Sequence, residues 1–269
     1  MLRKLKARWR STRARSEIAA RAFMPRPHGL SEPLTVTLTS YPARFGTLGW
    51  TLRSILTQTV AADRVVLWLA DGDEARLPED IRAIPGLEVR RAENMRSFTK
   101  IVPALEAFPA DVLVTADDDV YYPADWLERL VEARLAGATV AAHRAHRVTL
   151  SDGAPRPYRE WDWSIRAPDR SGLIFPTGVM GVLYAPGVFH ADAADAAKFR
   201  RLCPSSDDIW LYWMHRLNGH RAAKIGGKMR VLEWPESQET NLRSGNLAGQ
   251  GNDAAIRAMI SEYGFPSVE

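Results

Sequence analysis

The sequence contains very little cysteine and no long apolar segment. Cys203 is the only cysteine among 269 residues, which excludes an intrachain disulfide and a cysteine-based zinc cluster. No apolar run reaches the roughly 18 residues that span a bilayer, and no apolar stretch follows the basic start as in a signal peptide. A cytoplasmic location is therefore expected. No G-x-G-x-x-G or P-loop pattern opens an expected helix, which counts against dinucleotide and Walker-type binding.

What the sequence has is an ordinary globular composition with unevenly placed charge. Apolar residues make up 46% and charged residues 25%, which excludes disorder and leaves room for a large core. Of 36 basic and 32 acidic residues, residues 1–26 hold nine basic ones and only Glu17, so 27 basic and 31 acidic residues remain for the body. A nucleic-acid-binding protein would spread positive charge over its folded face, so no nucleic-acid partner is expected.

Residues 1–30 are expected to form a basic N-terminal arm. Leu2, Leu5 and Trp9 share one side of a helix with basic residues around them, which is typical of a segment on an anionic membrane surface. Through residues 1–26 the protein would then be peripheral at the inner face of the cytoplasmic membrane. A solvated basic tail is the alternative. Pro25 and Pro27 predict the end of the helix.

From residue 34 onward, short apolar strands alternate with helical periodicity, which indicates βαβ units and a mostly parallel sheet. The expected elements are Leu34–Thr39 (strand), Thr47–Gln58 (helix), Val65–Leu69 (strand), Glu79–Ala83 (helix), Leu87–Arg91 (strand), Ser97–Phe108 (helix, despite Pro103), Val112–Val114 (strand) and Ala124–Ala136 (helix). The fold class is therefore α/β, with a central sheet flanked by helices.

Beyond residue 140 the alternation is less regular. We expect a long loop over residues 151–172, then Gly178–Tyr184 (strand), Ser206–Leu217 (helix), Ala222–Ile225 (strand) and Asn252–Tyr263 (helix). This pattern predicts a domain over residues 31–235, with halves at 34–140 and 141–235. A loop and a helix over 236–269 would follow it.

Three consecutive aspartates, Asp117, Asp118 and Asp119, follow the expected strand Val112–Val114. Parallel sheets bind ligands at the carboxyl ends of their strands. Carboxylates crowded there repel one another, and a divalent cation relieves the repulsion. Mg²⁺ and Mn²⁺ favour one or two aspartates completed by substrate phosphates. The position after a buried strand favours this hypothesis over a solvated acidic turn.

A second acidic pair, Asp207 and Asp208, begins the helix expected from Ser206. Such residues commonly satisfy free N–H groups at a helix start. One carboxylate suffices for a cap, so the second is a candidate general base for an acceptor hydroxyl.

Other candidates rest on residue type alone. Lys100 and Arg44 are within reach of a phosphate in the expected fold, with ordinary surface roles as the alternative. Trp161 and Trp163 offer flat apolar faces to a sugar, although most tryptophans pack in cores. His143 and His146 are interpreted as polar strand positions rather than metal ligands.

Taken in order over residues 34–226, these segments resemble the GT-A nucleotide-sugar glycosyltransferases, most closely the family-2-like bacterial enzymes. The matching segments are Val36–Arg44, Leu52–Thr59, Val65–Asp71, Asp117–Asp119 with Pro123, Thr177–Gly181, Asp207-Asp208 and Leu217–Gly219. The run Asp117–Asp119 is similar to the family's DxD metal motif. Asp207-Asp208 stands where the family has a Glu-Asp base motif. The resemblance does not reach residues 1–30 or 230–269.

The resemblance implies a GT-A fold, an Mn²⁺ or Mg²⁺ cofactor and a nucleotide-diphosphate sugar donor, with UDP-sugars favoured. Asp119 would hold the metal with Asp117 or Asp118, depending on the register of the motif. Asp208 would be the base of an inverting transfer to a glycan or lipid-linked hydroxyl, and Asp207 would orient the acceptor. The implied donor-binding residues are Thr39, Ser40, Tyr41, Arg44, Asp71, Lys100, Asp117 and Asp118. The implied acceptor-binding residues are Trp161, Trp163, Gly178 and Gly181.

Three alternatives stay open. A metal-dependent nucleotidyltransferase shares the sheet and the carboxylates, but the segment after the first strand has no glycine before Gly46. A retaining glycosyltransferase would lack a base behind the anomeric carbon. An inactive GT-A-like scaffold would bind partners without turnover.

Overall fold

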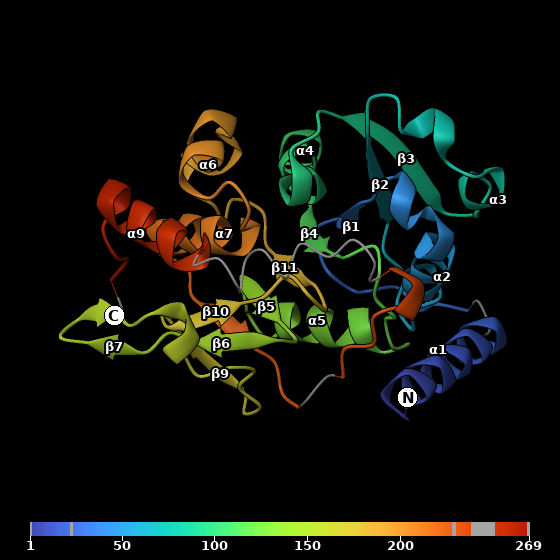
Figure 1. Cartoon of the computed structure of the whole chain (residues 1–269), viewed down its shortest axis with the longest axis horizontal. Helices are drawn as coiled ribbons and strands as arrows, with labels where there is room; N and C mark the ends of the chain where they lie inside the picture. Colours follow the sequence, from blue (N-terminus) through green and yellow to red (C-terminus); the bar gives the residue numbers. More distant parts are fainter. Residues whose placement is uncertain (1, 22–23, 228–229, 238–250, 268–269) are drawn as a thin grey trace.

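The computed structural model describes residues 2–21, 24–227, 230–237 and 251–267. An eight-stranded sheet in the order β3-β2-β1-β4-β11-β5-β12-β9 runs through both halves of the body, with helices on its two faces (Figure 1). The strands of this sheet are β1 (Leu34–Thr39), β2 (Arg64–Ala70), β3 (Leu87–Ala92), β4 (Val112–Thr115), β5 (Val140–Ala142), β9 (Asp169–Ser171), β11 (Val182–Tyr184) and β12 (Ala222–Lys224). The fold is thus α/β with a mostly parallel sheet flanked by helices, as predicted.

The first four strands are all parallel. In the register of the sheet, Val36 of β1 pairs with Val65 of β2 on one side and with Val114 of β4 on the other. The connections between these strands carry α2 (Phe45–Leu56), α3 (Glu79–Arg82) and α4 (Val102–Ala107). Since parallel strands end at the same edge, the segments that follow β1, β2 and β4 meet there.

The second half of the sheet mixes directions. Strand β11 is antiparallel to β4 and β5, β12 is parallel to β5, and β9 is antiparallel to β12. Two small sheets are formed by β6 (Ala145–Arg147) with β10 (Ile174–Pro176) and by β7 (Leu150–Ser151) with β8 (Ala154–Pro155). The region 151–172, expected as a long loop, therefore contains the short strands β8 and β9, and β6 and β10 lie on either side of it. The helices of this half are α5 (Trp126–Leu135), α6 (Ala196–Leu202), α7 (Asp207–Leu217) and α9 (Gly251–Tyr263).

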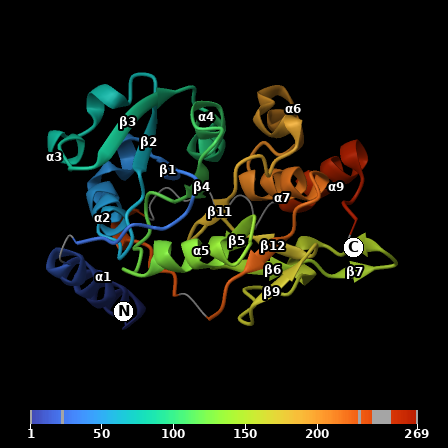
Figure 2. The same cartoon turned by 180° about the vertical axis from the view of Figure 1, so that it is seen from behind.

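Alternation along the central strands gives the sheet two apolar faces. Leu34, Val36 and Leu38 of β1 pack in the core under α2 and α5, which Figure 2 shows from behind. The opposite face packs under α4, α6, α7 and α9. The alternate positions of β1 are threonines, whose hydroxyl groups find hydrogen-bond partners on this opposite face. Thr37 Oγ1, for example, donates to the carbonyl of Lys100 at 2.6 Å. A side-chain period of two therefore separates the two cores.

Two sequence predictions fail locally. The helix expected over Ser97–Phe108 is a 3₁₀ helix, η3 (Arg96–Lys100), followed by α4, with Pro103 in the first turn of α4. Proline lacks an N–H and is tolerated only in a first turn, so the helix restarts there. The strand expected from Gly178 begins only at Val182, because Gly181, at φ +77°, forms a turn and a Cβ there would lie 2.6 Å from the Thr115 carbonyl oxygen.

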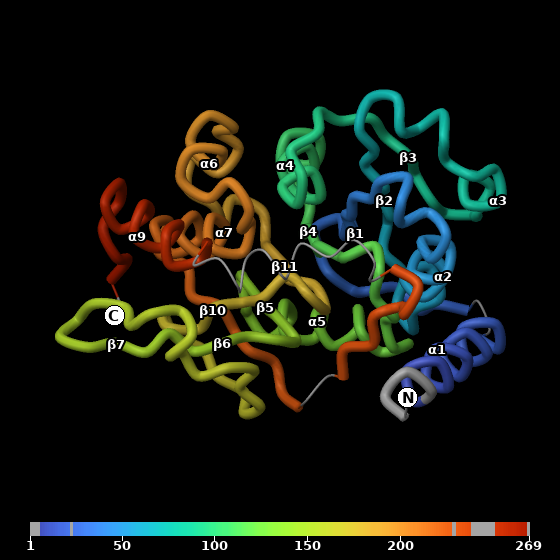
Figure 3. Tube along the Cα trace, viewed as in Figure 1, coloured from blue at the N-terminus to red at the C-terminus, as the bar shows by residue number. Residues whose placement is uncertain are grey.

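The N-terminal arm forms helix α1 (Leu2–Ala20), and its second half lies against the body. Ala14 and Ile18 are buried against Trp234, which directly precedes the 3₁₀ helix η6 (Pro235–Ser237). Figure 3 shows the trace of this segment running beside α2 toward α1. The docked part of α1 contradicts the solvated-tail alternative.

At the other end of the chain, α9 confirms the expected C-terminal helix, and residues 238–250 of the expected loop lie outside the described residues. Within the described part of the chain, no helix is both long and apolar enough to cross a membrane.

Candidate active site

A cleft of about 930 Å³ opens where β1, β2 and β4 end and α7 begins. This is the edge at which open α/β sheets bind ligands, and the volume suits a small molecule. Its lining includes Thr39, Ser40, Tyr41, Arg44, Ala70, Asp73, Arg96, Lys100, Asp117, Asp118, Asp119, Arg144, His146, Tyr158, Trp163, Asp207, Asp208 and Glu233.

The acidic segment, residues 117–123, leaves β4 and directs its three aspartates to two sides of the cleft. Asp118 accepts a hydrogen bond from Ser40 Oγ at 2.6 Å, on the side of the β1–α2 turn. Asp119 pairs with the guanidinium of Arg44 on the same side. Asp117 turns toward Lys100, with 3.0 Å between Oδ1 and Nζ. Arg44 is therefore the cation nearest to both Asp118 and Asp119, and Lys100 is the cation of Asp117.

Hydrogen bonds from behind hold the backbone of the acidic segment. Thr51 Oγ1 donates to the Asp118 carbonyl at 2.9 Å, and the Trp234 N–H donates to the Asp119 carbonyl at 2.9 Å. The indole N–H of Trp234 in turn donates to Thr51 Oγ1 at 2.8 Å. The Asp117 N–H donates to the buried Tyr122 hydroxyl at 2.8 Å. None of these bonds uses a carboxylate oxygen.

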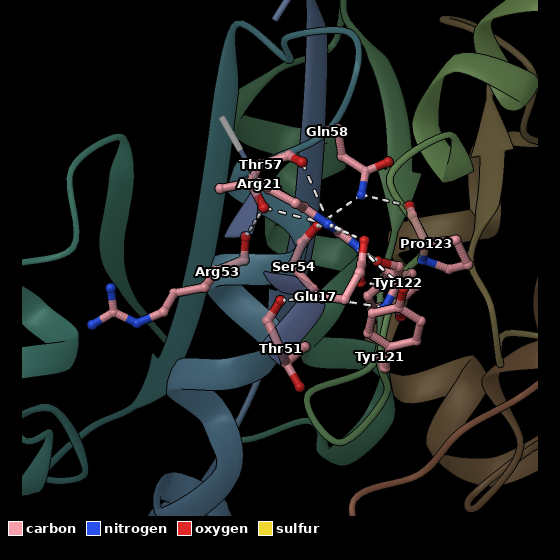
Figure 4. Close-up of polar contacts among 10 residues, drawn as sticks. All are labelled: Glu17, Arg21, Thr51, Arg53, Ser54, Thr57, Gln58, Tyr121, Tyr122 and Pro123. Carbon is pink, nitrogen blue, oxygen red and sulfur yellow. Dashed lines mark hydrogen bonds and ion pairs between the residues drawn. The ribbon is translucent and has the colours of Figure 1, made fainter. Parts of the chain in front are cut away.

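Arg21, just after α1, fastens the end of the acidic segment to α1 and α2 (Figure 4). Its side chain is only 6% exposed. It donates to the carbonyls of Ser54 at 2.9 Å and Tyr122 at 2.8 Å, and pairs with Glu17 at 2.9 Å. Tyr121, beside Tyr122, donates to Glu17. A single guanidinium thus joins three separate segments of the chain.

Lys100 lies between the two acidic groups of the cleft. Its ammonium is 3.0 Å from Asp117 Oδ1 and 3.0 Å from Asp207 Oδ2, and the residue is 6% exposed. Burial opposes its charge, but Asp117, Asp207 and Asp208 outweigh that effect and hold the pKa of Lys100 well above its usual value. Lys100 therefore remains charged and links the end of β4 to the start of α7.

The two aspartates at the start of α7 face the cleft rather than the helix end. Ser206 stands at the N-cap without a side-chain cap bond. Asp208 Oδ1 accepts the N–H of Gly178 at 2.9 Å, an approach that a Cβ on Gly178 would block at 2.8 Å. Burial, reinforced by Asp207, raises the pKa of Asp208 to about 7 against the pull of Lys100. A carboxylate of that basicity accepts protons near neutral pH.

Burial and neighbouring charges also have opposite effects on pKa values on the other side of the cleft, at Asp118 and Arg44. Burial raises the pKa of Asp118 to about 7, with Asp119 adding to the shift and Ser40 and Arg44 opposing it. Burial disfavours the charged form of Arg44, but Asp119 and Asp118 favour it more strongly, so the pKa of Arg44 rises. The cleft therefore contains more negative charge than its own cations stabilise fully.

The remaining wall of the cleft is aromatic. Trp163 is 38% exposed, and its ring centre lies 4.6 Å from that of His146 and 5.2 Å from that of Tyr158. Trp161, two residues earlier, is 3% exposed and packs against Phe175 at 5.2 Å between ring centres. Of the two tryptophans expected to meet a sugar, only Trp163 offers a face to the cleft.

The structure brings most of the predicted site residues together. Those that line the cleft are Thr39, Ser40, Tyr41, Arg44, Lys100, Asp117, Asp118, Asp119, Trp163, Asp207 and Asp208. Four others do not line it: Asp71 is exposed beyond β2, Trp161 is in the core, and Gly178 and Gly181 lie behind the cleft wall. Asp73 occupies the cleft where Asp71 was expected.

Sequence reasoning missed Asp73, Arg144, His146 and Glu233 as cleft residues. Asp73 carried a signal, because it stands two residues beyond Asp71 in the same turn. Arg144 directly precedes β6 and His146 lies within it, in a stretch of ordinary strand character. Glu233 reaches the cleft through an isolated bridge between Glu233 and Val120, and no local pattern indicates this contact.

Comparison with known proteins gives a partial structural likeness and no sequence relative. No protein-family model matches the chain, and no curated protein matches it. Many solved structures overlay on part of it, among them the following three. A mannosyltransferase from Pyrobaculum calidifontis, in complex with GDP-Man and Mn²⁺, has 18% identity, a TM-score of 0.34, and covers 51% of this chain and 42% of its own.

A glucosyl-3-phosphoglycerate synthase from Mycobacterium tuberculosis, with Mn²⁺, UDP and phosphoglyceric acid, has 18% identity and a TM-score of 0.34 over 42% of this chain and 43% of its own. A mycobacterial protein has 19% identity and a TM-score of 0.33, over 42% of this chain and 40% of its own. The chain therefore spans less than half the length of each. Likeness at this level leaves the chemistry to be judged from the cleft itself.

Proposed function

We propose that the protein is a metal-dependent glycosyltransferase that moves a sugar from a nucleotide-diphosphate donor, with UDP-sugars favoured, to the hydroxyl of a glycan or lipid-linked acceptor. The observation that carries this proposal is the convergence in one cleft of five aspartates from two elements, with Arg44 and Lys100 between them. Leaving-group departure and acceptor deprotonation need charged groups on two sides of one sugar, and the cleft has them.

The donor would bind at the ends of β1 and β2. Thr39, Ser40 and Tyr41 line this side, and Asp73 stands across from them after β2. Arg44 would exchange part of its pairing with Asp118 and Asp119 for diphosphate oxygens, because a planar guanidinium binds phosphate in the same two-pronged way as carboxylate.

The donor set of the cleft fits a divalent cation only with help from the substrate. Among the described residues, no group of three His, Cys, Asp or Glu side chains is arranged to hold a metal ion. Asp119, with Asp118 or Asp117, would supply one or two carboxylates, and diphosphate oxygens the remaining ligands. Mn²⁺ or Mg²⁺ bound there would neutralise charge that develops on the leaving diphosphate. Arg44 and Lys100 already face carboxylates, and the acidic side chains of the cleft lining outnumber the basic ones, so a further cation would improve the charge balance.

The acceptor would enter from the side of α7 and the aromatic wall. Trp163 presents an exposed ring on which the C–H face of a sugar can stack. Asp208 would remove the proton of the acceptor hydroxyl, since its oxygen is held by Gly178 at the cleft wall. Asp207, held by Lys100, would orient the acceptor. A base opposite the leaving group gives inversion at the anomeric carbon.

The test is donor turnover with Mn²⁺ across UDP-, GDP- and dTDP-sugars, read as released nucleotide, together with thermal stabilisation by each nucleotide. One nucleotide should stabilise the protein and its sugar should be hydrolysed slowly. Asp119→Asn should lower this turnover at least about 100-fold, because loss of a ligand to a charge-neutralising metal costs several kcal/mol. Asp208→Asn should keep donor stabilisation and lose transfer.

The matched control is Asp125→Asn, an exposed aspartate six positions beyond Asp119 and outside the cleft lining, which should behave as wild type. Formation of a nucleotide sugar from a nucleoside triphosphate and a sugar phosphate would instead show a nucleotidyltransferase. Nucleotide binding with no turnover in any arm would show a scaffold. If none of the nucleotides stabilises the protein, the proposal is wrong.

A further inference from the structure

Helix α1 has two faces with different surroundings. Ser11, Ala14 and Ile18 recur at helical spacing and are buried against the body. The outer face, defined here as Lys6, Arg8, Trp9, Arg10 and Arg13, consists of exposed residues on the opposite side and the flanks of the helix. The body therefore fixes which side of the helix is presented to the surroundings.

The cations of the outer face differ from Arg15, Arg21 and Arg26, which also belong to the arm. Arg15 pairs with Glu236, Arg21 with Glu17, and Arg26 with Glu128. Lys6, Arg8, Arg10 and Arg13 make no ion pair within the described residues. Their charge is directed outward without compensation, on a protein whose body is net acidic.

An exposed indole stands among these cations. Trp9 is 62% exposed, and the Arg13 guanidinium lies 5.7 Å from its ring centre. Large apolar side chains are costly to expose, and tryptophan surrounded by Lys and Arg is the composition of helices that lie in the headgroup region of a bilayer. Indole sits at that depth while the cations meet lipid phosphates.

We propose that the outer face of α1 docks the protein onto an anionic lipid membrane, with the helix parallel to the surface. Charge complementarity selects this partner, because four uncompensated cations surround one interfacial aromatic ring. A nucleic acid is disfavoured, since the excess of positive charge is confined to one helix and is not spread over the folded face. The proposal does not depend on the reaction assigned to the cleft.

Sedimentation of the full-length protein with vesicles of phosphatidylcholine and phosphatidylglycerol tests this. Wild type should bind these vesicles, should not bind pure phosphatidylcholine, and should be released as salt is raised. Arg10→Gln with Arg13→Gln should weaken partitioning about 25-fold, because each cation near an anionic surface contributes about a fivefold effect. Trp9→Ala should weaken binding at every salt concentration, since its contribution is apolar.

The matched control is Arg159→Gln with Arg170→Gln, two exposed arginines of the body that give the same change in net charge. It should bind vesicles as wild type does. Equal losses in both double variants would show attraction by net charge alone and overturn the assignment to α1. Absence of wild-type binding to anionic vesicles, or binding to duplex DNA in its place, would also overturn it.

Discussion

The acidic segment is held from two sides by arginine and lysine, and the two sides differ in kind. Toward the cleft, Arg44 and Lys100 pair with carboxylates that stay within reach of a ligand. Toward α1, the guanidinium of Arg21 is directed mainly to carbonyl oxygens, and Glu17, which is half-exposed, is the only carboxylate that it binds among the described residues. The cleft side concentrates charge, whereas the α1 side satisfies backbone groups.

The two sides of the acidic segment therefore have different roles, since one holds its backbone and the other pairs with its carboxylates. Bonds from Thr51, Trp234 and Arg21 fix the backbone without using a carboxylate. The backbone of the acidic segment is then positioned by groups that lie outside the cleft lining. Preorganised charge of this kind is what a site needs if it is to bind an ion and a diphosphate without first rearranging. Substitutions on the two sides should therefore respond differently to pH.

The largest effect is expected on the cleft side, from Lys100→Met. Removing the ammonium leaves Asp117 and Asp207 without their cation in a buried place, which costs about 3–5 kcal/mol of unfolding free energy at pH 8. The cost should shrink at pH 5.5, because burial raises the pKa of Asp117 and its carboxylate can then take up a proton. Urea unfolding at the two pH values measures it.

Lys198→Met is the matched control, because Lys198 makes a surface ion pair with Asp192, and its loss should change the unfolding free energy much less than that of Lys100 at either pH. A loss for Lys100→Met that is equal at both pH values would contradict the charge-balance account of the cleft side.

A smaller effect is expected on the α1 side, from Arg21→Ala. The carbonyls of Ser54 and Tyr122 lose their donor, and orphaned carbonyls of this kind cost about 2 kcal/mol. The loss should be about the same at pH 5.5 and pH 8, because the two carbonyl oxygens that lose their donor do not titrate. Urea unfolding measures this loss as well.

Arg53→Ala, an exposed arginine of α2 beside Ser54, should change the unfolding free energy by less than about 0.5 kcal/mol. If the Arg21→Ala variant instead showed the pH dependence expected for Lys100→Met, the two sides of the acidic segment would not be distinct.

The sequence predicts the cleft side far better than the α1 side. The strands that end there are short apolar runs whose periodicity is local, and the residues that follow them, Ser40 and Asp117–Asp119, are placed by sheet geometry alone. Lys100 was predicted to reach a donor phosphate, and its role as the link to Asp207 follows only from how η3 folds against β1. Local pattern indicated the place of Lys100 but not its partners.

The α1 side depends on contacts that no local pattern records. Nine basic residues precede position 27, and nothing in their spacing distinguishes the buried Arg21 from the exposed Arg13. Trp161 and Trp163 show the same limit, since one is in the core and the other lines the cleft. In each case, contacts with segments far away along the chain decide whether the side chain is buried. The hydrogen bond between Trp234 and Thr51 is a contact of this kind.

The smallest effect is expected at the edge of the cleft side, from Asp208→Asn. The folded-state pKa of Asp208 is raised to about 7, so between about pH 4 and pH 7 the folded protein keeps a proton that the unfolded chain has lost. Wild-type stability should therefore fall as pH rises through this window. The amide keeps the oxygen that accepts from Gly178 and has no charge to lose.

The variant should thus gain stability relative to wild type. This gain should increase by about 1–2 kcal/mol from pH 5 to pH 8, and urea unfolding at both pH values measures it. Asp125→Asn, exposed at the start of α5, should show no such trend. A gain that is flat with pH would mean that Asp208 is already ionised in the folded protein throughout this range. The extra negative charge of the cleft would then have to reside on the acidic segment, on the side that Arg44 faces.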